Sequence, residues 1–348
     1  MKPLVIAHRG ACGYRPEHTL AAYALAIEQG ADFIEPDLVP TRDGVLIARH
    51  ENELSDSTDV ADRPVFADRR CVKVVDGIER TGWFSEDFTL DEIKALRARE
   101  RLPQLRPDNT AYDGCFEVPT FAEILALLRQ AEGQGRRVGV YPETKHPTYF
   151  ARAGRHLDGQ AIASSLPQQV VAALCEAGFT DPDRVFLQSF EIESLLELRR
   201  VWMPAAGVDF PLVQLIGNPR RGRPQDLAWH LDQGHDLEAV YGDLGACWPE
   251  GLGESLRYGH LLQPVALGWL RAQGVAALGP SFETLLPEGP DGAATSLLAD
   301  AHAAGLAVHP YTLRAELGGE AYGRRLLELG VEGFFIDQPD LGCRLRDG

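Results

Sequence analysis

The chain has 348 residues, 45% of them hydrophobic and 24% charged, and its formal net charge is −17 at pH 7. A chain of this length can bury a large core, whereas its acidic balance disfavours nonspecific binding to nucleic acid and to anionic lipid surfaces. Its apolar runs are shorter than the roughly 18 residues that a membrane-spanning helix needs, so no stable membrane association is expected.

The first elements of the chain alternate between strand and helix. Residues 5–7 are short and apolar, which predicts a buried strand. A helix is expected over residues 17–29, where apolar residues share one face, and Gly30 stands in the usual C-terminal position. Residues 33–38 then predict a second strand.

Two carboxylates lie one residue apart in this second strand. Because side chains alternate along a strand, Glu35 and Asp37 are expected to point to the same side. Two close carboxylates repel each other unless positive charge lies between them, and a hard cation such as Ca²⁺ or Mg²⁺ prefers oxygen ligands. A Glu-x-Asp pair on its own is more often a solvated strand edge. Pro36 cannot donate a ladder hydrogen bond, so the strand is expected to end there.

Two histidines follow apolar runs in a similar way. His8 comes directly after the first strand, and His50 comes after a third apolar run. A lone histidine at such a place is more often structural, but the histidines, Glu35 and Asp37 occupy corresponding places in successive β-units. With Arg9, they predict one rim that carries acid–base groups, a divalent-cation site and an anion clamp. That combination suits phosphate-ester chemistry.

The remaining chain continues the alternation. Helices are expected over residues 120–131, 161–175, 191–201, 294–304 and 321–329. Strands are expected over residues 138–141, 185–188, 212–215, 275–278, 306–309 and 333–336. With the two strands at the start, the total is eight. The sequence therefore predicts an α/β protein whose single domain, residues 1–348, is a (β/α)8 TIM barrel.

Two long stretches do not fit this alternation. A barrel of this kind needs about 250 residues, so the excess is expected in insertions. Residues 51–116 lack clean alternation and are rich in Asp, Arg and turn formers. Residues 217–260 are irregular, rich in Gly, Pro and Asp, and contain several aromatic residues and histidines, Trp248 among them. This second stretch is expected to be either a substrate lid or a surface loop.

The cysteines and the N-terminus bear on the compartment. The six cysteines are scattered and form no Cys-x-x-Cys pair, so a zinc site is not expected. A disulfide between Cys71 and Cys115 is one option, and free thiols in a reducing compartment are the other. Residues 1–3 lead directly into the first strand and leave no room for a signal peptide. The chain is expected in the cytoplasm, or in the periplasm or outside the cell if a leader has been removed.

Several ordered motifs run along the chain. The early ones are His8-Arg9-Gly10, Pro16-Glu17-x-Thr19, Gly30-Ala31-Asp32-x-Ile34-Glu35-x-Asp37, Thr41-x-Asp43-Gly44 and His50. The later ones are Pro142-Glu143-x-Lys145, Leu187-Gln188-Ser189-Phe190, His309-Pro310-Tyr311-Thr312 and Phe335-x-Asp337-x-Pro339-Asp340. Over nearly the whole chain they resemble the motifs of the glycerophosphodiester phosphodiesterases. Residues 87–93 resemble the longer, often periplasmic, branch of that family.

The resemblance implies hydrolysis of small glycerophosphodiesters to glycerol 3-phosphate and an alcohol, on a barrel with a small insertion subdomain at residues 51–116. His8 and His50 are then expected to be the general acid and base. One divalent cation, Ca²⁺ in preference to Mg²⁺, is expected on three carboxylates: Glu35, Asp37 and Glu143. Four residues are expected to bind substrate, two at the phosphate and two as an apolar wall: Arg9, Lys145, Phe190 and Tyr311.

Some positions and functions stay open at this stage. His18 stands where the family usually has Asn, and Glu51 where it usually has Asp. Asp337 is expected either to cap a turn or to touch ligand, and Gln188 could be core. A phospholipase C- or D-like enzyme and a catalytically silent binding protein are the alternative functions. The acidic charge speaks against the first, and the retained histidines and carboxylates speak against the second. The oligomeric state cannot be read from the sequence.

Overall fold

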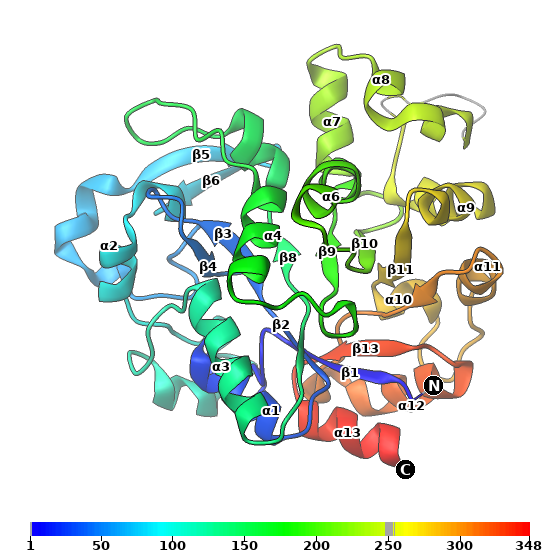
Figure 1. Ribbon diagram of the computed structural model, residues 1–348. Helices are drawn as coiled ribbons and strands as arrows, with labels where there is room; N and C mark the ends of the chain where they lie inside the picture. Colours follow the sequence, from blue (N-terminus) through cyan, green and yellow to red (C-terminus); the bar gives the residue numbers. More distant parts are fainter. Residues whose placement is uncertain (1, 248–252, 254) are drawn as a thin grey trace.

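Short apolar runs form the parallel strands of a closed barrel, and helices pack around it (Figure 1). The computed structural model describes residues 2–247, 253 and 255–348. Within those residues the barrel strands are β1 (Leu4–His8), β2 (Phe33–Glu35) continuing as β3 (Asp37–Pro40), β7 (Gly139–Val140) continuing as β8 (Glu143–Thr144), β9 (Leu187–Ser189), β10 (Leu212–Ile216), β11 (Val275–Pro280), β12 (Ala307–Val308) and β13 (Gly333–Ile336). The predicted (β/α)8 barrel is confirmed.

Backbone pairing places the strands in barrel order. One run of paired strands is β13-β1-β2-β7, and the other is β12-β11-β10-β9-β8-β3. The two runs join because β2–β3 and β7–β8 are each one strand with a short break. Closure occurs after β12, where the Leu313 amide donates to the Phe335 carbonyl at 2.8 Å and the Phe335 amide donates to the Pro310 carbonyl at 3.0 Å.

As predicted, the second strand ends at Pro36: β2 stops at Glu35, and the chain then continues as β3. Proline lacks only the donor, and its carbonyl still accepts a hydrogen bond from the Glu143 amide at 2.9 Å. The strand therefore resumes as β3, where Asp37 lies opposite Glu143 of β8. A short antiparallel strand, β4 (Leu46–Ala48), pairs with the outer side of β3.

The helices that cover the barrel are α1 (Leu20–Glu28), α3 (Phe121–Gly133), α4 (Leu166–Glu176), α5 (Ile192–Glu197), α6 (Met203–Ala206), α9 (Pro264–Ala272), α10 (Phe282–Leu285), α11 (Leu297–Ala303), α12 (Gly319–Leu329) and α13 (Pro339–Asp347). Three of them, α1, α3 and α4, begin at a side-chain cap. The helix expected from residue 17 begins at Leu20, because the Thr19 hydroxyl caps the Ala22 amide. The helix expected from residue 161 begins at Leu166, after the Ser165 cap. A wide π-helical turn, Leu198–Trp202, joins α5 to α6.

Aromatic side chains fill the inside of the barrel below the strand ends. Ile6, Phe33, Tyr141, Val213, Ala277 and Phe335 form one buried cluster. Tyr141 stacks on Phe186 with ring centroids 4.8 Å apart, and its hydroxyl lies 2.9 Å from Nδ1 of His309. The barrel is thus a packed core, as in other barrels of this type, and leaves only its C-terminal rim for a site.

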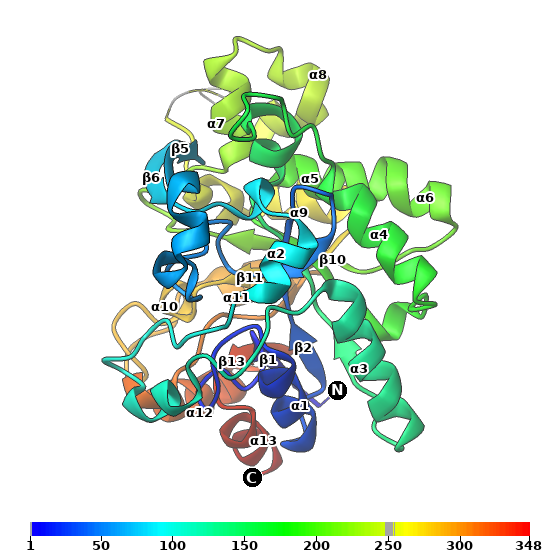
Figure 2. The same ribbon diagram turned by 90° about the vertical axis from the view of Figure 1, so that its left-hand side faces the viewer.

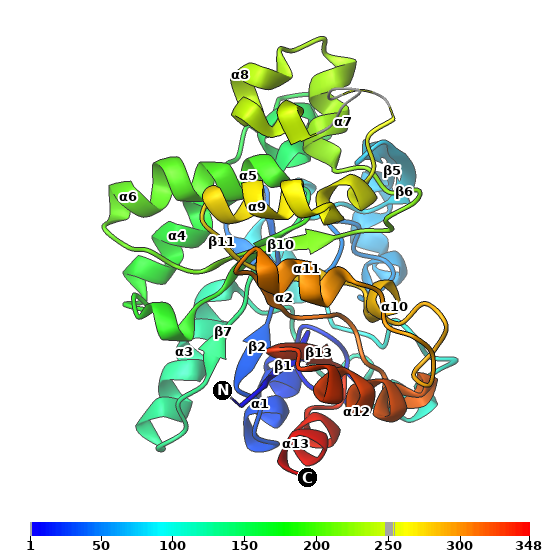
Figure 3. The same cartoon turned by 90° about the vertical axis from the view of Figure 1, so that its right-hand side faces the viewer.

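The two long stretches carry small elements of their own. Residues 51–116 contain the hairpin β5 (Cys71–Val75) and β6 (Ile78–Gly82), followed by α2 (Leu90–Ala95). Residues 217–260, expected to be irregular, contain α7 (Gln225–Asp232) and α8 (Leu237–Tyr241), while Trp248 lies outside the described residues. Figures 2 and 3 show both the hairpin and these two helices in the upper half of the molecule, away from the C-terminal α13. That residues 51–116 form a separate subdomain remains a prediction.

The cysteines are unpaired. All six are free thiols, so the Cys71–Cys115 disulfide is absent and that option was wrong. Cys71 lies in β5, whereas Cys115 is exposed. Among the described residues, no helix is both long and apolar enough to cross a membrane.

Candidate active site

One cavity of about 140 Å³ lies where the barrel strands end. All nine side chains predicted to act in the site line it: His8, Arg9, Glu35, Asp37, His50, Glu143, Lys145, Phe190 and Tyr311. Gln188, Leu215, Thr312, Arg314 and Phe335 also contribute to its wall. The barrel therefore brings together residues that are far apart in the sequence.

Three buried carboxylates meet in this cavity. Glu35, Asp37 and Glu143 each place one oxygen within 4.8 Å of the others. Burial, with repulsion from the other two acids, raises the pKa of Glu35 well above its usual value. Burial also raises the pKa of Glu143 to about 8, against the attraction of Lys145 and with the added repulsion of Asp37. A hard cation relieves such crowding of oxygen donors, so this set of ligands fits a divalent metal ion.

Two cationic side chains flank the carboxylates. Lys145 Nζ lies 2.9 Å from Glu143 Oε1 and 3.5 Å from Asp37 Oδ1. Arg9 Nη1 donates to Glu17 at 2.9 Å. Arg9 Nε is buried without a hydrogen-bond partner, 3.4 Å from Asp37 Oδ2. A phosphate oxygen in the cavity could accept a hydrogen bond from this free N–H. Such a bond between a guanidinium and a phosphate is charge-assisted and therefore strong.

Asp37 stays ionised among these groups. Burial alone would raise its pKa, but Lys145, His18 and Arg9 together hold the pKa of Asp37 well below its usual value. The three acids thus differ in charge state although they lie side by side. Gln188 adds a neutral contact, since its Nε2 donates to Glu35 Oε1 at 3.1 Å.

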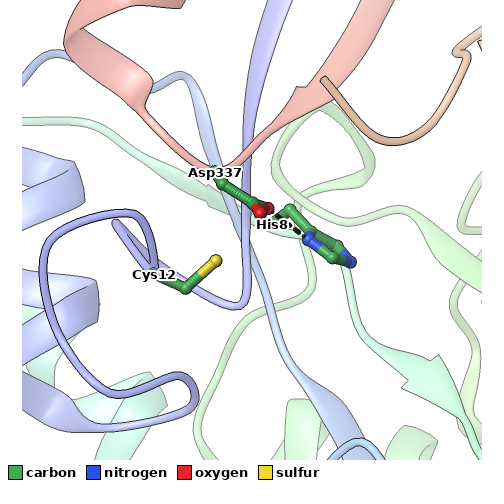
Figure 4. A group of neighbouring side chains, drawn as sticks. All are labelled: His8, Cys12 and Asp337. Carbon is green, nitrogen blue, oxygen red and sulfur yellow. Dashed lines mark hydrogen bonds and ion pairs between the residues drawn. The ribbon is translucent and has the colours of Figure 1, made fainter. Parts of the chain in front are cut away.

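His8 forms a buried pair with Asp337, shown in Figure 4. Nδ1 of the ring lies 2.6 Å from Asp337 Oδ1, while the other carboxylate oxygen binds Arg106 and Arg314. A carboxylate at Nδ1 fixes the proton on that nitrogen and leaves Nε2 as the acceptor. Burial and the charge of Arg9 lower the pKa of His8 to about 4, although Asp337 opposes the shift. His8 is therefore neutral near pH 7.

Cys12 completes a second group of possible metal ligands with His8 and Asp337 (Figure 4). Its sulfur lies 3.6 Å from Nη1 of Arg106. Burial raises the pKa of the Cys12 thiol well above its usual value, so the sulfur is a neutral thiol beside a guanidinium. These surroundings disfavour a cation, and the contacts serve instead to orient His8.

His50 begins a chain of acids and histidines that reaches the β5–β6 hairpin. Its Nδ1 lies 3.2 Å from Glu51 Oε1, and Nε2 of His146 lies 3.4 Å from Glu51 Oε2. His146 Nδ1 in turn lies 2.5 Å from Asp76 Oδ2. Burial and nearby cations lower the pKa of His50 to about 3. Burial acts the same way on His146, but Asp76 outweighs it and raises the pKa of His146 to about 10.

Phe190 and Tyr311 form the apolar side of the cavity. Their ring centroids are 5.9 Å apart with the planes at 80°. The Tyr311 hydroxyl donates to the Ile216 carbonyl at 2.6 Å, which holds the ring in place. Both residues therefore lie where the predicted wall for substrate carbons was expected.

Several residues support the site from outside the cavity, and Asp337, expected either to cap a turn or to touch ligand, is one of them. Glu17 holds Arg9, and the buried His18 lies with Nε2 2.9 Å from Asp37 Oδ2, so His18 supports a carboxylate and does not line the cavity. Asp337 lies against His8 and is not part of the cavity wall either. Arg9, His18 and His146 all have positive φ angles, of 59°, 54° and 49°. The motifs contained Glu17 and Asp337, but only the fold shows which partner each one holds.

Comparison with known proteins gives consistent matches. The model of the glycerophosphoryl diester phosphodiesterase family matches residues 8–240 and 254–341. A glycerophosphodiester phosphodiesterase of Arabidopsis thaliana is 32% identical over 97% of this chain and 84% of its own length. One of Haemophilus influenzae is 30% identical over 99% of this chain and 90% of its own length.

A solved structure supports the fold. A phosphodiesterase of Oleispira antarctica, in complex with the product sn-glycerol-3-phosphate, matches with a TM-score of 0.60. The match covers 100% of this chain and 98% of that one at 18% sequence identity. At this identity the likeness concerns the barrel alone.

Proposed function

Because the chain belongs to the glycerophosphoryl diester phosphodiesterase family, we propose that it hydrolyses glycerophosphodiesters to glycerol 3-phosphate and an alcohol, using one divalent cation and two histidines. The chain is an enzyme of the phosphoric diester hydrolase class. The observation that carries the proposed mechanism is the trio of carboxylate oxygens within 4.8 Å of one another, in the same cavity as His8 and His50.

Glu35, Asp37 and Glu143 would hold the cation. Carboxylate oxygens suit both Ca²⁺ and Mg²⁺, and we expect Ca²⁺ because residues 87–93 resemble the longer branch of the family. When bound, such an ion supplies Lewis-acid stabilisation of charge on the nonbridging phosphate oxygens. Arg9 and Lys145 would add positive charge at the same place. Negative charge on the nonbridging oxygens grows in the transition state, so these side chains would stabilise the transition state more than the ground state.

Two proton transfers are needed to replace one alcohol by another nucleophile at phosphorus. One histidine, as the neutral imidazole, takes a proton from the attacking hydroxyl. The other must be protonated to give a proton to the leaving alcohol oxygen, and its carboxylate partner together with the bound anionic phosphate would favour that charged form. Both rings are suited to this because each has a carboxylate at Nδ1, Asp337 for His8 and Glu51 for His50. Phe190 and Tyr311 would pack against the glycerol carbons.

The test is product analysis. The purified chain is incubated with a glycerophosphodiester and Ca²⁺ or Mg²⁺, and glycerol 3-phosphate is measured enzymatically. Formation of glycerol 3-phosphate and the free alcohol in equal amounts is expected. Free glycerol with a phosphorylated alcohol would indicate cleavage of the other ester bond, as in a phospholipase C-like reaction. No turnover with either cation would contradict the proposal.

A further inference from the structure

A second cavity adjoins the first. Its volume is about 190 Å³, and both cavities are lined by Glu143, Lys145 and Phe190. A phosphodiester carries two alcohols on one phosphorus. If the phosphate lies beside Lys145, with one alcohol against the wall of the first cavity, the other alcohol has the second cavity as its space.

Among the described residues, three that line the second cavity have a buried polar atom without a hydrogen-bond partner. His146 Nε2 faces Glu51 at 3.4 Å. The other two are Asp76 Oδ1, at the tip of the β5–β6 hairpin, and Arg223 Nη2, in the loop before α7. Unsatisfied buried polar atoms are uncommon in folded proteins and indicate a missing partner. One is an acceptor and the other is a donor, and a hydroxyl group can serve both because it donates and accepts.

The charges in this cavity do not favour a cationic ligand. The carboxylate of Asp76 is already paired with His146 at 2.5 Å. Glu191 accepts hydrogen bonds from the amide and hydroxyl of Thr148, and burial raises the pKa of Glu191 well above its usual value, so this acid is uncharged. Within the described part of the chain, no acid of this cavity forms an ion pair with the guanidinium of Arg223.

The aromatic residues do not form a cage for a quaternary ammonium group. Phe190 and Tyr258 meet edge to face, with centroids 6.2 Å apart. The cation of Lys145 already lies 5.6 Å from the centroid of Phe190. Cation–π recognition needs free ring faces around the ligand, and here a protein cation occupies one of them.

We propose that the second cavity binds the leaving alcohol and prefers a polyol, such as glycerol or inositol, to choline. In this arrangement Arg223 Nη2 donates to one hydroxyl, and Asp76 Oδ1 accepts from another. The inference rests on the proposed hydrolysis of glycerophosphodiesters and adds the class of alcohol to it.

The experiment compares kcat/KM for glycerophosphoglycerol and for glycerophosphocholine in the wild type and in Arg223→Gln. The wild type is expected to prefer glycerophosphoglycerol. Arg223→Gln is expected to lower kcat/KM for glycerophosphoglycerol about tenfold, as for loss of one charge-assisted hydrogen bond, and to change the choline substrate less than twofold. Arg221→Gln is the matched control, because Arg221 is an exposed arginine of the same loop, and it should leave both values unchanged.

Preference of the wild type for choline would overturn the proposal, as would equal losses on both substrates in Arg223→Gln. Turnover of either diester upholds the hydrolytic function itself, so the substrate ratio tests the cavity separately. If neither diester were turned over, calorimetric titration of both into the full-length protein with chelator would still decide. Binding of glycerophosphoglycerol that is tighter than that of glycerophosphocholine and weakened by Arg223→Gln supports the polyol site, and equal binding contradicts it.

Discussion

Each of the two histidines proposed for catalysis lies beside a carboxylate, and the two carboxylates come from different parts of the chain. Asp337 comes from the end of the last barrel strand and lies against His8, whereas Glu51 is the direct neighbour of His50. Both rings thereby expose Nε2 for proton transfer while Nδ1 is held. Such a partner fixes the tautomer and the ring orientation, so the function of each histidine depends on a residue that need not touch substrate.

Replacing either histidine by alanine is expected to remove most activity. A positioned acid or base contributes about 10²- to 10⁴-fold, so kcat of His8→Ala and of His50→Ala should fall by that range. Both rings lie at strand ends, outside the apolar layer of the barrel, so thermal melting should change little. The loss of kcat in the double variant should be smaller than the product of the two single losses, because both histidines assist the same phosphoryl-transfer step. A folded single variant that keeps more than about a tenth of wild-type kcat would refute the two-histidine assignment.

His146 gives a pH dependence of stability whose sign can be stated. The folded chain holds the His146 proton up to about pH 10 because of Asp76, while an unfolded histidine loses it near pH 6.5. The stabilisation is therefore complete below about pH 6.5 and is lost as pH rises through about 10. His146→Gln should lower the free energy of unfolding by roughly 1–3 kcal/mol near pH 6, and the gap to wild type should close toward pH 10. Urea unfolding of both proteins across this pH range measures the difference in free energy of unfolding. A difference that stays constant with pH would show that His146 and Asp76 do not form an ion pair.

At the scale of elements, the β5–β6 hairpin connects residues 51–116 to the site through a two-residue turn. Asp76 and Gly77 have φ angles of 51° and 75°, the left-handed values that a tight Asp-Gly hairpin turn requires. This geometry presents Asp76 to His146 and to the second cavity.

The turn can be tested with paired glycine variants. Gly77→Ala and Gly135→Ala each place a side chain at a positive φ, of 75° and 85°, with no atom near the new Cβ. Both should lose roughly 1 kcal/mol of stability from backbone strain. Only Gly77→Ala should also lower kcat/KM, by roughly tenfold, because it displaces Asp76. Equal activity of the two variants would mean that the turn has no part in the site.

The elements themselves could be largely predicted from the sequence because their patterns are local. All eight barrel strands lie within or next to the apolar runs that predicted them. The predicted helix starts were wrong where a single contact decides, because the caps Thr19 and Ser165 place the first helical residues at Leu20 and Leu166. The second strand ends before Pro36 as predicted, but the sequence did not indicate that the chain continues as β3. Residues 217–260 were expected to be irregular because Gly and Pro are frequent there, yet the described part contains α7 and α8.

The site was predictable as far as it consists of strand ends. His8, Glu35, Asp37 and Glu143 follow apolar runs directly, so the barrel geometry alone brings them together. The partners on loops were not predictable in the same way. The contacts from Asp337 to His8 and from Asp76 to His146 join residues that are distant in sequence, and local pattern carries no information on such pairs.

At the scale of the whole molecule, charge and surface bear on the choice between soluble diesters and intact lipids. The net charge is −17. The main exposed apolar group near the hairpin is Val72, Val74 and Ile78, each 56–58% exposed. Three aliphatic side chains on a hairpin, in a chain with a net charge of −17, are a weak basis for binding to a lipid surface.

The chain is therefore expected to hydrolyse glycerophosphocholine at least about tenfold faster than phosphatidylcholine in vesicles. The reason is that the protein gains little binding free energy by inserting its exposed side chains into an anionic or zwitterionic lipid surface. The measurement compares the rates of hydrolysis of the soluble diester and of the vesicles at equal phosphodiester concentration. Val72→Thr with Val74→Thr should leave the rate on the soluble diester unchanged. Faster cleavage of the vesicles, reduced by these substitutions, would favour the phospholipase-like alternative.

The central claim is that three buried carboxylates hold one catalytic divalent cation. The most direct measurement is kcat/KM for a glycerophosphodiester after exhaustive chelation, followed by titration with Ca²⁺ and, separately, with Mg²⁺. The account predicts that chelation removes activity and that activity returns at one cation per chain, with Ca²⁺ more effective than Mg²⁺. At the same cation concentration, activity should not return in the carboxylate variants Glu35→Gln, Asp37→Asn and Glu143→Gln. Undiminished turnover of the chelated wild type, with metal analysis showing no bound cation, would contradict it.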